Sequence, residues 1–243
     1  MKLSGRNPVL ERLRARPHSI QKIFLQENLS DGGPIYEIAK KFHIPIFVVA
    51  ASKLVKLSHS MNSQGVLAEV EDFFYADYSE VLMGALQEKQ TLLFLDRLND
   101  PQNLGVIIRS AACLGGFAII LPTHDSVEVT EAVLRVASGA DSHIPIARVG
   151  NLSQAISAAK KEGFWIAGTV VEAGRNIMNE ALPFPLGLVI GSEHKGIRDG
   201  LLKQADILLT LPMPTAKLSF NVAQAATIFC YEITRQKNKK KSQ

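Results

Sequence analysis

The sequence predicts an α/β fold in two parts, and three observations lead to that prediction. The chain has 243 residues, a comfortable length for two domains. From residue 91 onward, nearly continuous apolar runs alternate with helical patterns, as in parallel sheets covered on both faces. Before that point only three strands are predicted, over 19–25, 44–49 and 65–70. We therefore predict a small α/β domain over 1–76, a linker over 77–90, a doubly wound, mostly parallel α/β domain over 91–236 and a basic tail over 237–243.

The small domain is predicted to alternate helices and strands. In chain order these are a basic helix over 7–14, a strand over 19–25, a helix from Gly32, and strands over 44–49 and 65–70. Gly32-Gly33-Pro34 opens the second helix, because proline is favoured in a first helical turn. A polar loop over 59–65 joins the last two strands. The linker carries one helix over 79–87, with Ser79 as its expected N-cap.

Six strands and five helices are predicted in the larger domain. The strands are 92–95, 117–121, 144–147, 164–171, 186–190 and 207–211, and the helices are 101–114, 129–137, 152–162, 197–204 and 221–235. The helix over 101–114 has the best-marked ends. Asp100 is its expected N-cap, Pro101 its first residue, and Gly115-Gly116 its stop.

Composition excludes several classes of protein. Apolar residues make up 47% of the chain, yet no run approaches the roughly 20 residues of a membrane span. The first residues lack the apolar stretch of a signal peptide, so we expect a cytoplasmic protein. Cys113 and Cys230 stand in apolar, helix-like segments and are expected to be buried, reduced thiols. The six histidines are scattered, and no metal site is predicted.

The net charge of +4 reflects an uneven distribution of basic residues. Lysine and arginine are concentrated in the first quarter of the chain, and four lysines lie close to its end. Such a distribution suits a polyanionic partner. A solubilising tail and solvated helix faces explain the same pattern, so charge alone does not decide between them.

Three polar loops follow predicted strands, where open α/β sheets bind their ligands. The first covers 96–105 and leads into a helix start, whose free N–H groups favour anions. Arg109 follows among apolar residues of that helix. A guanidinium is costly to bury unpaired, so Arg109 either faces a site or a carboxylate, or extends outward from the helix face.

The second loop is Gly191-Ser192-Glu193-His194-Lys195-Gly196. Its two glycines permit close approach of backbone to a ligand. It is neither a dinucleotide-binding fingerprint nor a P-loop. We expect His194 to be an exposed turn residue. Glu193 is equally compatible with capping the next helix and with belonging to a site.

The third loop contains Pro212-Met213-Pro214 and ends at Ser219-Phe220-Asn221, where a helix of small residues begins. Ser219 is an expected N-cap of that helix. Capping explains the serine but not the paired prolines, which fix the path of the chain beside a strand end.

Taken in this order, the three loops resemble the three motifs of SpoU-type RNA 2′-O-ribose methyltransferases of the SPOUT class. The matching segments are 99–109, 191–196 and 211–222. The N-terminal unit, which begins Gly5-Arg6-Asn7-Pro8-Val9-Leu10, resembles the substrate-binding domain, similar to ribosomal protein L30e, of the 23S rRNA guanosine methyltransferases in that family.

The resemblance implies a deep trefoil knot, in which the C-terminal segment threads under an earlier loop and forms a cleft for S-adenosylmethionine. It implies homodimers with the active site at the subunit interface and no need for a metal. The positions implied for cofactor binding are Gly191, Gly196, Leu211, Phe220, Thr169 and Met213. This sequence departs from the family at His194 and Phe220, where smaller residues and leucine are usual, and over 215–218, which lacks a frequent glycine.

The implied reaction moves a methyl group from a sulfonium to a ribose 2′-hydroxyl, so the enzyme must align the reactants and help remove a proton. The resemblance assigns activation to Arg109, which would grip the phosphate beside the ribose. Asn103, Glu193, Ser219 and Asn221 would position Arg109 and the ribose. We expect 2′-O-methylation of a guanosine in 23S rRNA. The alternatives are a tRNA or another rRNA site, and a non-catalytic RNA-binding adaptor; a nucleotide-binding oxidoreductase is disfavoured, because its glycine fingerprint is missing.

Overall fold

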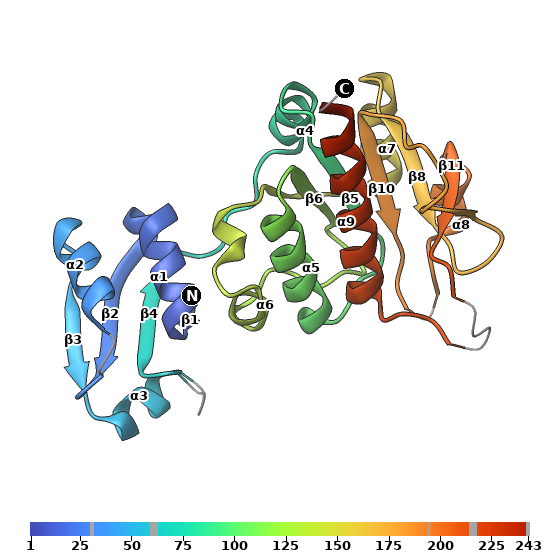
Figure 1. The fold of residues 1–243 in the computed structure, drawn as a ribbon. Helices are drawn as coiled ribbons and strands as arrows, with labels where there is room; N and C mark the ends of the chain where they lie inside the picture. Colours follow the sequence, from blue (N-terminus) through green and yellow to red (C-terminus); the bar gives the residue numbers. More distant parts are fainter. Residues whose placement is uncertain (30–31, 59–62, 194, 214–217, 242–243) are drawn as a thin grey trace. The chain divides into compact units, whose positions relative to one another are not determined.

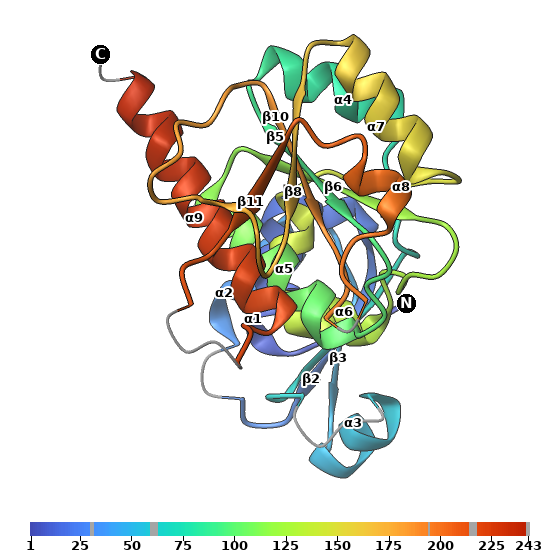
Figure 2. The ribbon, with the colours of Figure 1, turned by 90° about the vertical axis from the view of Figure 1, so that its right-hand side faces the viewer.

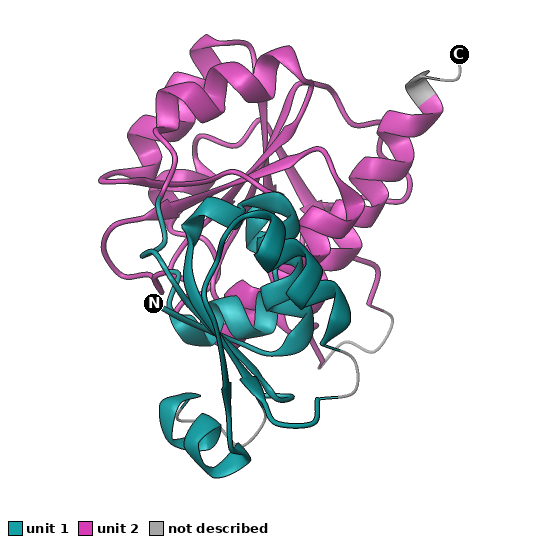
Figure 3. Ribbon diagram, turned by 90° about the vertical axis from the view of Figure 1, so that its left-hand side faces the viewer, with its two compact units in different colours: residues 1–74, 129–143 teal, residues 75–128, 144–243 magenta. Residues whose placement is uncertain are grey.

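The computed structural model describes residues 1–29, 32–58, 63–193, 195–213 and 218–241 (Figure 1). His194, Pro214, most of the segment 215–218 and part of the polar loop 59–65 therefore lie outside the described residues. The chain forms two compact units (Figure 3). Unit 1 contains residues 1–74 and 129–143, and unit 2 contains residues 75–128 and 144–243.

Unit 1 is built on a four-stranded sheet. Its order is β1-β4-β2-β3, with β1 (Lys2–Ser4) and β2 (Ile20–Gln26) antiparallel to β4 (Val66–Val70), and β3 (Ile46–Val49) parallel to β2. Its helices are α1 (Arg6–Ala15), η1 (Pro17–Ser19), α2 (Gly33–Lys41), α3 (Ala51–Ser58), α6 (Glu131–Ala137) and η2 (Ala140–Ser142). Neither β1 nor α3 was predicted, since both are too short to show a periodic pattern.

The segment with α6 and η2 packs in unit 1, although its sequence lies between two strands of the other unit. Asp141 forms a buried ion pair with Arg12 of α1, and Glu131 accepts a hydrogen bond from the Lys2 backbone N–H at 2.6 Å. Burial raises the pKa of Asp141, and the Arg12 guanidinium opposes that rise. This placement differs from the predicted domain of 91–236, because the tertiary contacts of the segment are not visible in its sequence.

Unit 2 contains a seven-stranded sheet in the order β7-β6-β5-β10-β8-β11-β9, and every neighbouring pair is parallel. The strands are β5 (Thr91–Leu95), β6 (Phe117–Pro122), β7 (Ile146–Val149), β8 (Trp165–Thr169), β9 (Arg175–Asn176), β10 (Leu186–Ile190) and β11 (Ile207–Thr210). The predicted parallel α/β domain is confirmed, with β9 as an additional short strand. The trefoil knot concerns the threading of the chain and stays a prediction.

Helices cover both faces of this sheet (Figure 2). They are α4 (Tyr78–Gln87), α5 (Pro101–Leu114), α7 (Leu152–Lys161), α8 (Asp199–Leu202) and α9 (Val222–Lys241). Leu92 and Phe94 of β5 pack into one core with residues of α4 and α7. Their neighbours Leu93 and Leu95 are equally buried, and successive side chains of a strand point to opposite faces. The continuous apolar runs are thus explained by burial on two sides.

The helix ends confirm some predictions and correct others. The bounds and caps of α5 are as predicted, with Asp100 accepting from the Gln102 N–H and Gly115 at φ +71. The N-cap of α4 is Asp77, which accepts from the N–H groups of Ser79 and Glu80; the prediction of Ser79 was wrong. The last helix continues to Lys241, into the predicted tail, because lysine favours helices.

The two cysteines differ in their surroundings. Cys230 is buried, as predicted, and burial raises its pKa to about 12. Cys113 is exposed, so the prediction for it was wrong; it lies on α5 with Val106 and Arg109, on the face turned to solvent. Within the described part of the chain, no group of three or more metal-binding side chains occurs and no helix is long and apolar enough to cross a membrane.

Candidate functional site

The three polar loops meet at one edge of the unit 2 sheet, because the carboxyl ends of parallel strands share an edge. Asp96, at the end of β5, is fully buried and ties two of them together. Its carboxylate accepts from the backbone N–H of Arg198 at 2.9 Å and from the guanidinium of the same residue at 2.6 and 2.8 Å. Arg97 donates to the carbonyls of Lys195 and Gly196 at 3.4 and 3.2 Å. The loop after β10 is therefore fastened to the end of β5.

Gly191 begins that loop where only a glycine fits. A Cβ at this position would lie 2.1 Å from the carbonyl carbon of Gly196 and 2.3 Å from the nitrogen of Ile197. Gly196 closes the turn at φ +59, and its N–H donates to the Ser192 carbonyl at 2.9 Å. The two glycines predicted as cofactor positions thus bring the two arms of one turn into backbone contact.

One residue from each loop joins a network that we call the amide–carboxylate cluster: Asn103, Glu193 and Asn221. The Asn103 amide donates to Glu193 Oε1 at 3.2 Å, and the Asn221 amide donates to Asn103 Oδ1 at 3.1 Å. Asn221 also donates to Glu193 Oε1. Because Asn103 lies in the first turn of α5 and Asn221 immediately precedes α9, the cluster joins the starts of two helices to the loop after β10.

The same cluster settles two capping questions. Asn221 Oδ1 accepts from the Ala223 N–H at 2.9 Å, so Asn221 caps α9 and the expectation for Ser219 was wrong. Glu193 Oε1 accepts from the Val222 N–H at 3.4 Å. The carboxylate therefore contacts the first turn of α9 rather than capping the helix that follows it in sequence, and it belongs to the network of the site.

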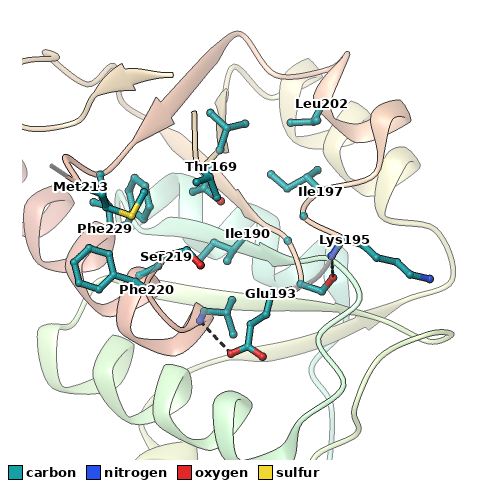
Figure 4. A pocket seen from close by; sticks show the side chains of 18 of the residues that line it. Thr169, Ile190, Glu193, Lys195, Ile197, Leu202, Met213, Ser219, Phe220 and Phe229 are labelled. Carbon is teal, nitrogen blue, oxygen red and sulfur yellow. Dashed lines mark hydrogen bonds between the residues drawn. The ribbon is translucent and has the colours of Figure 1, made fainter. Parts of the chain in front are cut away.

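Beside the cluster lies a cavity of about 350 Å³, the edge pocket (Figure 4). All six residues predicted for cofactor binding line it, as do Glu193 and Ser219. Much of its wall is apolar, from Ile190, Leu211, Phe220 and Phe229. Polar atoms come from the turn after β10 and from Thr169, whose hydroxyl donates to the Val189 carbonyl at 3.1 Å. The pocket can hold a small amphipathic molecule against backbone groups and apolar side chains.

Arg109 is not among the residues that line this pocket. Its side chain is exposed on α5 and makes no hydrogen bond or ion pair with any residue that the structure describes. Of the five predicted catalytic residues, the structure thus joins Asn103, Glu193 and Asn221, places Ser219 in the neighbouring pocket wall, and leaves the charge of Arg109 free.

Several residues of the site were not predicted. Asp96 and Arg198 anchor the loops, and Val222, Ala225 and Phe229 bring one face of α9 to the pocket. The helical spacing of these last three residues was a usable signal. For Asp96, the signal was an acidic residue directly after a buried strand.

Asn221→Asp separates capping from the cluster. Aspartate caps a helix as well as asparagine does, but here it places a carboxylate beside Glu193. We expect the free energy of unfolding to fall by about 1–3 kcal/mol at pH 8. The loss should be smaller at pH 5, because the folded variant holds one shared proton more tightly than the unfolded chain does and stability then declines as pH rises.

The measurement is urea unfolding followed by fluorescence of Trp165, the one tryptophan of the chain, which lies in β8. Asn151→Asp is the matched control, because Asn151 caps α7 through Ser153 and Gln154 without contacting a carboxylate. Equal losses in the two variants, or a loss independent of pH, would contradict the described cluster.

Comparison with known proteins identifies the architecture. The model of the SpoU rRNA methylase family matches residues 90–231, and that of the RNA 2′-O ribose methyltransferase substrate-binding domain matches residues 3–76. The chain is 36% identical over 238 residues to YacO of Bacillus subtilis, described as a TrmH family tRNA/rRNA methyltransferase, which covers 96% of this chain and 95% of YacO. It is 37% identical over 230 residues to the 23S rRNA (guanosine-2′-O-)-methyltransferase RlmB of Coxiella burnetii, at 93% and 91% coverage.

Among solved structures, the SpoU methyltransferase AviRb from Streptomyces viridochromogenes, in complex with the cofactor AdoMet, superimposes with a TM-score of 0.82 at 23% identity. The match covers 98% of this chain and 91% of AviRb. With the family model spanning the edge pocket, the amide–carboxylate cluster and α5, we conclude that this chain belongs to the SpoU rRNA methylase family.

Proposed function

We propose that the protein transfers a methyl group from S-adenosylmethionine to a ribose 2′-hydroxyl of 23S rRNA, with a guanosine as the target nucleoside. The observation that carries the proposal is the meeting of the three loops in one cluster and one pocket, lined by all six residues predicted to hold the cofactor. The relative RlmB, whose description specifies that reaction, matches this chain over nearly its whole length.

The edge pocket fits the proposed cofactor. Its apolar walls suit an adenine ring, and the cradle at Gly191, which a Cβ would fill, brings backbone N–H and carbonyl groups close to a ligand. When bound, S-adenosylmethionine supplies a methyl group already activated on a sulfonium. The chain's own residues then have to bind the cofactor, orient the ribose toward its methyl group and exclude water. Two carboxylates, of Glu193 and Asp199, and one ammonium, of Lys195, lie in the pocket wall, so the balance of charge favours a cationic ligand.

Arg109 is proposed to bind the phosphate beside the target ribose. Its guanidinium has a planar fork of donors that fits phosphate. An exposed arginine without a protein partner is available for such a contact. Asn103, from the first turn of the same helix, links α5 to Glu193, so the helix that carries Arg109 is held against the loop after β10.

We also propose that two copies associate through α5 and α9. These helices lie side by side (Figure 2). The hydroxyl of Thr227 donates to that of Ser110 at 2.8 Å. Each exposes apolar side chains on its outer face: Val106 on α5, and Ile228 and Tyr231 on α9. Arg109 lies on the same face as Val106. Association there would bury these side chains and bring Arg109 to the subunit interface.

The alternative within the family is a tRNA substrate, which the description of YacO leaves open at similar identity. The match of residues 3–76 to a substrate-binding domain favours rRNA, because relatives that act on tRNA often lack such a domain. The alternative of a different class is a non-catalytic RNA-binding adaptor. The hydrogen-bonded Asn103, Glu193 and Asn221 disfavour it, since binding RNA alone does not require them.

Methyl transfer tests the proposed reaction directly. Labelled S-adenosylmethionine is incubated with the protein and with rRNA from cells that lack the modification, and the labelled nucleotide is mapped. We expect label on one ribose in 23S rRNA and none when that ribose is replaced by deoxyribose. Arg109→Ala should reduce turnover about 100-fold, with little change in cofactor affinity, because Arg109 does not line the edge pocket.

Arg175→Ala is the control, since that arginine is exposed, pairs with Glu180 and does not line the pocket. Label that persists on the deoxyribose substrate would indicate base methylation. Tight RNA binding without any labelling would support the non-catalytic adaptor. Label in tRNA would show that the substrate is tRNA and not rRNA.

Tyr231→Glu tests the proposed interface. The added charge should be incompatible with a buried apolar contact, so the variant should sediment as a monomer while the wild type sediments as a dimer. Met83→Glu is the control, because Met83 is similarly exposed on α4, at the opposite face of the sheet. A monomeric wild type, or a dimeric Tyr231→Glu variant, would refute the interface.

A further inference from the structure

An aromatic pair lies on one face of the unit 1 sheet. Phe24 of β2 and Phe47 of β3 are cross-strand partners, with ring centroids 5.6 Å apart and planes inclined by 29°. Their neighbours Ile23 and Leu25 point to the other face and are buried. Phe47 is 48% exposed, which is unusual for a phenylalanine at the centre of a short strand.

Among the described residues, α3 covers one end of this sheet face. Leu54 and Leu57 of α3 pack on Val49, Leu67 and the half-buried Phe24. The helix stops there, and Figure 1 shows it at one end of β2 and β3. Because β3 is the edge strand of the sheet, the ring of Phe47 stands at an open border.

One lysine lies beside the aromatic pair, and two more lie on α3, the helix that packs next to it. Lys22 Nζ lies 5.6 Å from the centroid of the Phe24 ring and is held by Glu69 at 2.9 Å, itself a carboxylate on the same face. Lys53 and Lys56 are exposed on α3, and their side-chain ammonium groups make no hydrogen bond or ion pair with any residue in the described ranges. Two lysines without partners on the helix beside an exposed ring leave this side of unit 1 with uncompensated positive charge.

We propose that the surface made by Lys22, Phe24, Phe47, Lys53 and Lys56, the aromatic face, binds unpaired nucleotides of the RNA substrate. A base stacks on Phe47, and Lys53 and Lys56 contact the flanking phosphates. An exposed ring can stack on a base, and free cations can bind the phosphates of the RNA backbone. An apolar protein partner would instead leave the lysines buried and unpaired. Double-stranded RNA would not use the ring, because its bases are stacked within the helix.

The inference rests on the proposed function for the existence of an RNA substrate, but it concerns a surface in unit 1 and not the edge pocket. It adds a specific expectation: recognition begins on a single-stranded segment. Stacking on a base tolerates any sequence, so the aromatic face contributes affinity and requires an unpaired region of RNA. The target ribose is selected by other contacts.

Fluorescence anisotropy with a labelled adenosine dodecamer tests the aromatic face in the full-length protein. Phe47→Ala should weaken binding about ten-fold, the effect of losing one stacked base. Phe47→Leu preserves apolar bulk in the strand and should weaken binding comparably, while Phe47→Tyr keeps the ring and the affinity. Tyr36→Ala is the control, since Tyr36 is an exposed aromatic residue of α2 in the same unit.

An abasic oligomer of the same length separates stacking from charge. Its affinity should be insensitive to Phe47→Ala, whereas Lys53→Ala with Lys56→Ala should weaken both probes and reduce the salt dependence of binding. Unchanged dodecamer affinity in both Phe47→Ala and Phe47→Leu would overturn the proposal, and so would an equal loss in Tyr36→Ala.

Methyl transfer by the wild type distinguishes this failure from failure of the proposed function. If the wild type methylates rRNA while Phe47 is irrelevant to binding, the aromatic face is wrong and the function stands. If Phe47 governs binding but no methyl is transferred, the aromatic face stands and the function is wrong.

Discussion

The carboxylate of Glu193 is the contact on which the site depends. It accepts hydrogen bonds from amides of two residues that are far apart in sequence, Asn103 and Asn221, and from the N–H of Val222. The donors belong to the starts of α5 and α9 and the carboxylate to the loop after β10, so the cluster is the point where these three segments are joined. A carboxylate with amide donors and a helix N-terminus around it is well satisfied, so the arrangement is specific as well as stabilising. Removing one of these side chains would break hydrogen bonds that hold the other two in position.

The hydrogen bonds of the cluster can form because other contacts already hold the loops close together. Asp96 fixes Arg198 at the far end of the loop after β10, and Gly191 allows its near end to meet Gly196. Between these points the loop has little freedom, and its backbone groups form part of the pocket wall. The shape of the pocket therefore follows from the order of the strands, the buried carboxylate of Asp96 and the absence of a side chain at Gly191. Exposed Arg109 on α5 is positioned indirectly, through the attachment of its helix at Asn103.

Local sequence signals were sufficient to predict an element where a single residue type fitted the required position. The bounds of α5 followed from Asp100, Pro101 and Gly115, and the buried strands from their apolar runs. Prediction failed where neighbouring residues were equally suited, as with Asp77 beside Ser79 and Asn221 beside Ser219, since only geometry decides which side chain reaches the free N–H groups. The segment with α6 and η2 packs in unit 1 through contacts such as the Arg12–Asp141 pair of η2, which joins residues distant in sequence. For the site, the family resemblance supplied what spacing could not: the residues of three separate loops meet.

The central claim is that the amide–carboxylate cluster shapes the pocket as one unit, and a double-mutant cycle on cofactor affinity tests it most directly. S-adenosylmethionine binding is measured by calorimetry for the wild type, Asn103→Ala, Asn221→Ala and the double variant. Neither asparagine lines the pocket, so any effect must act through the cluster. We predict that each single variant weakens binding about ten-fold and that the double variant is little worse than either, because removing one partner already disrupts the network. Unchanged affinity in the single variants, or losses that simply add in the double variant, would contradict the account.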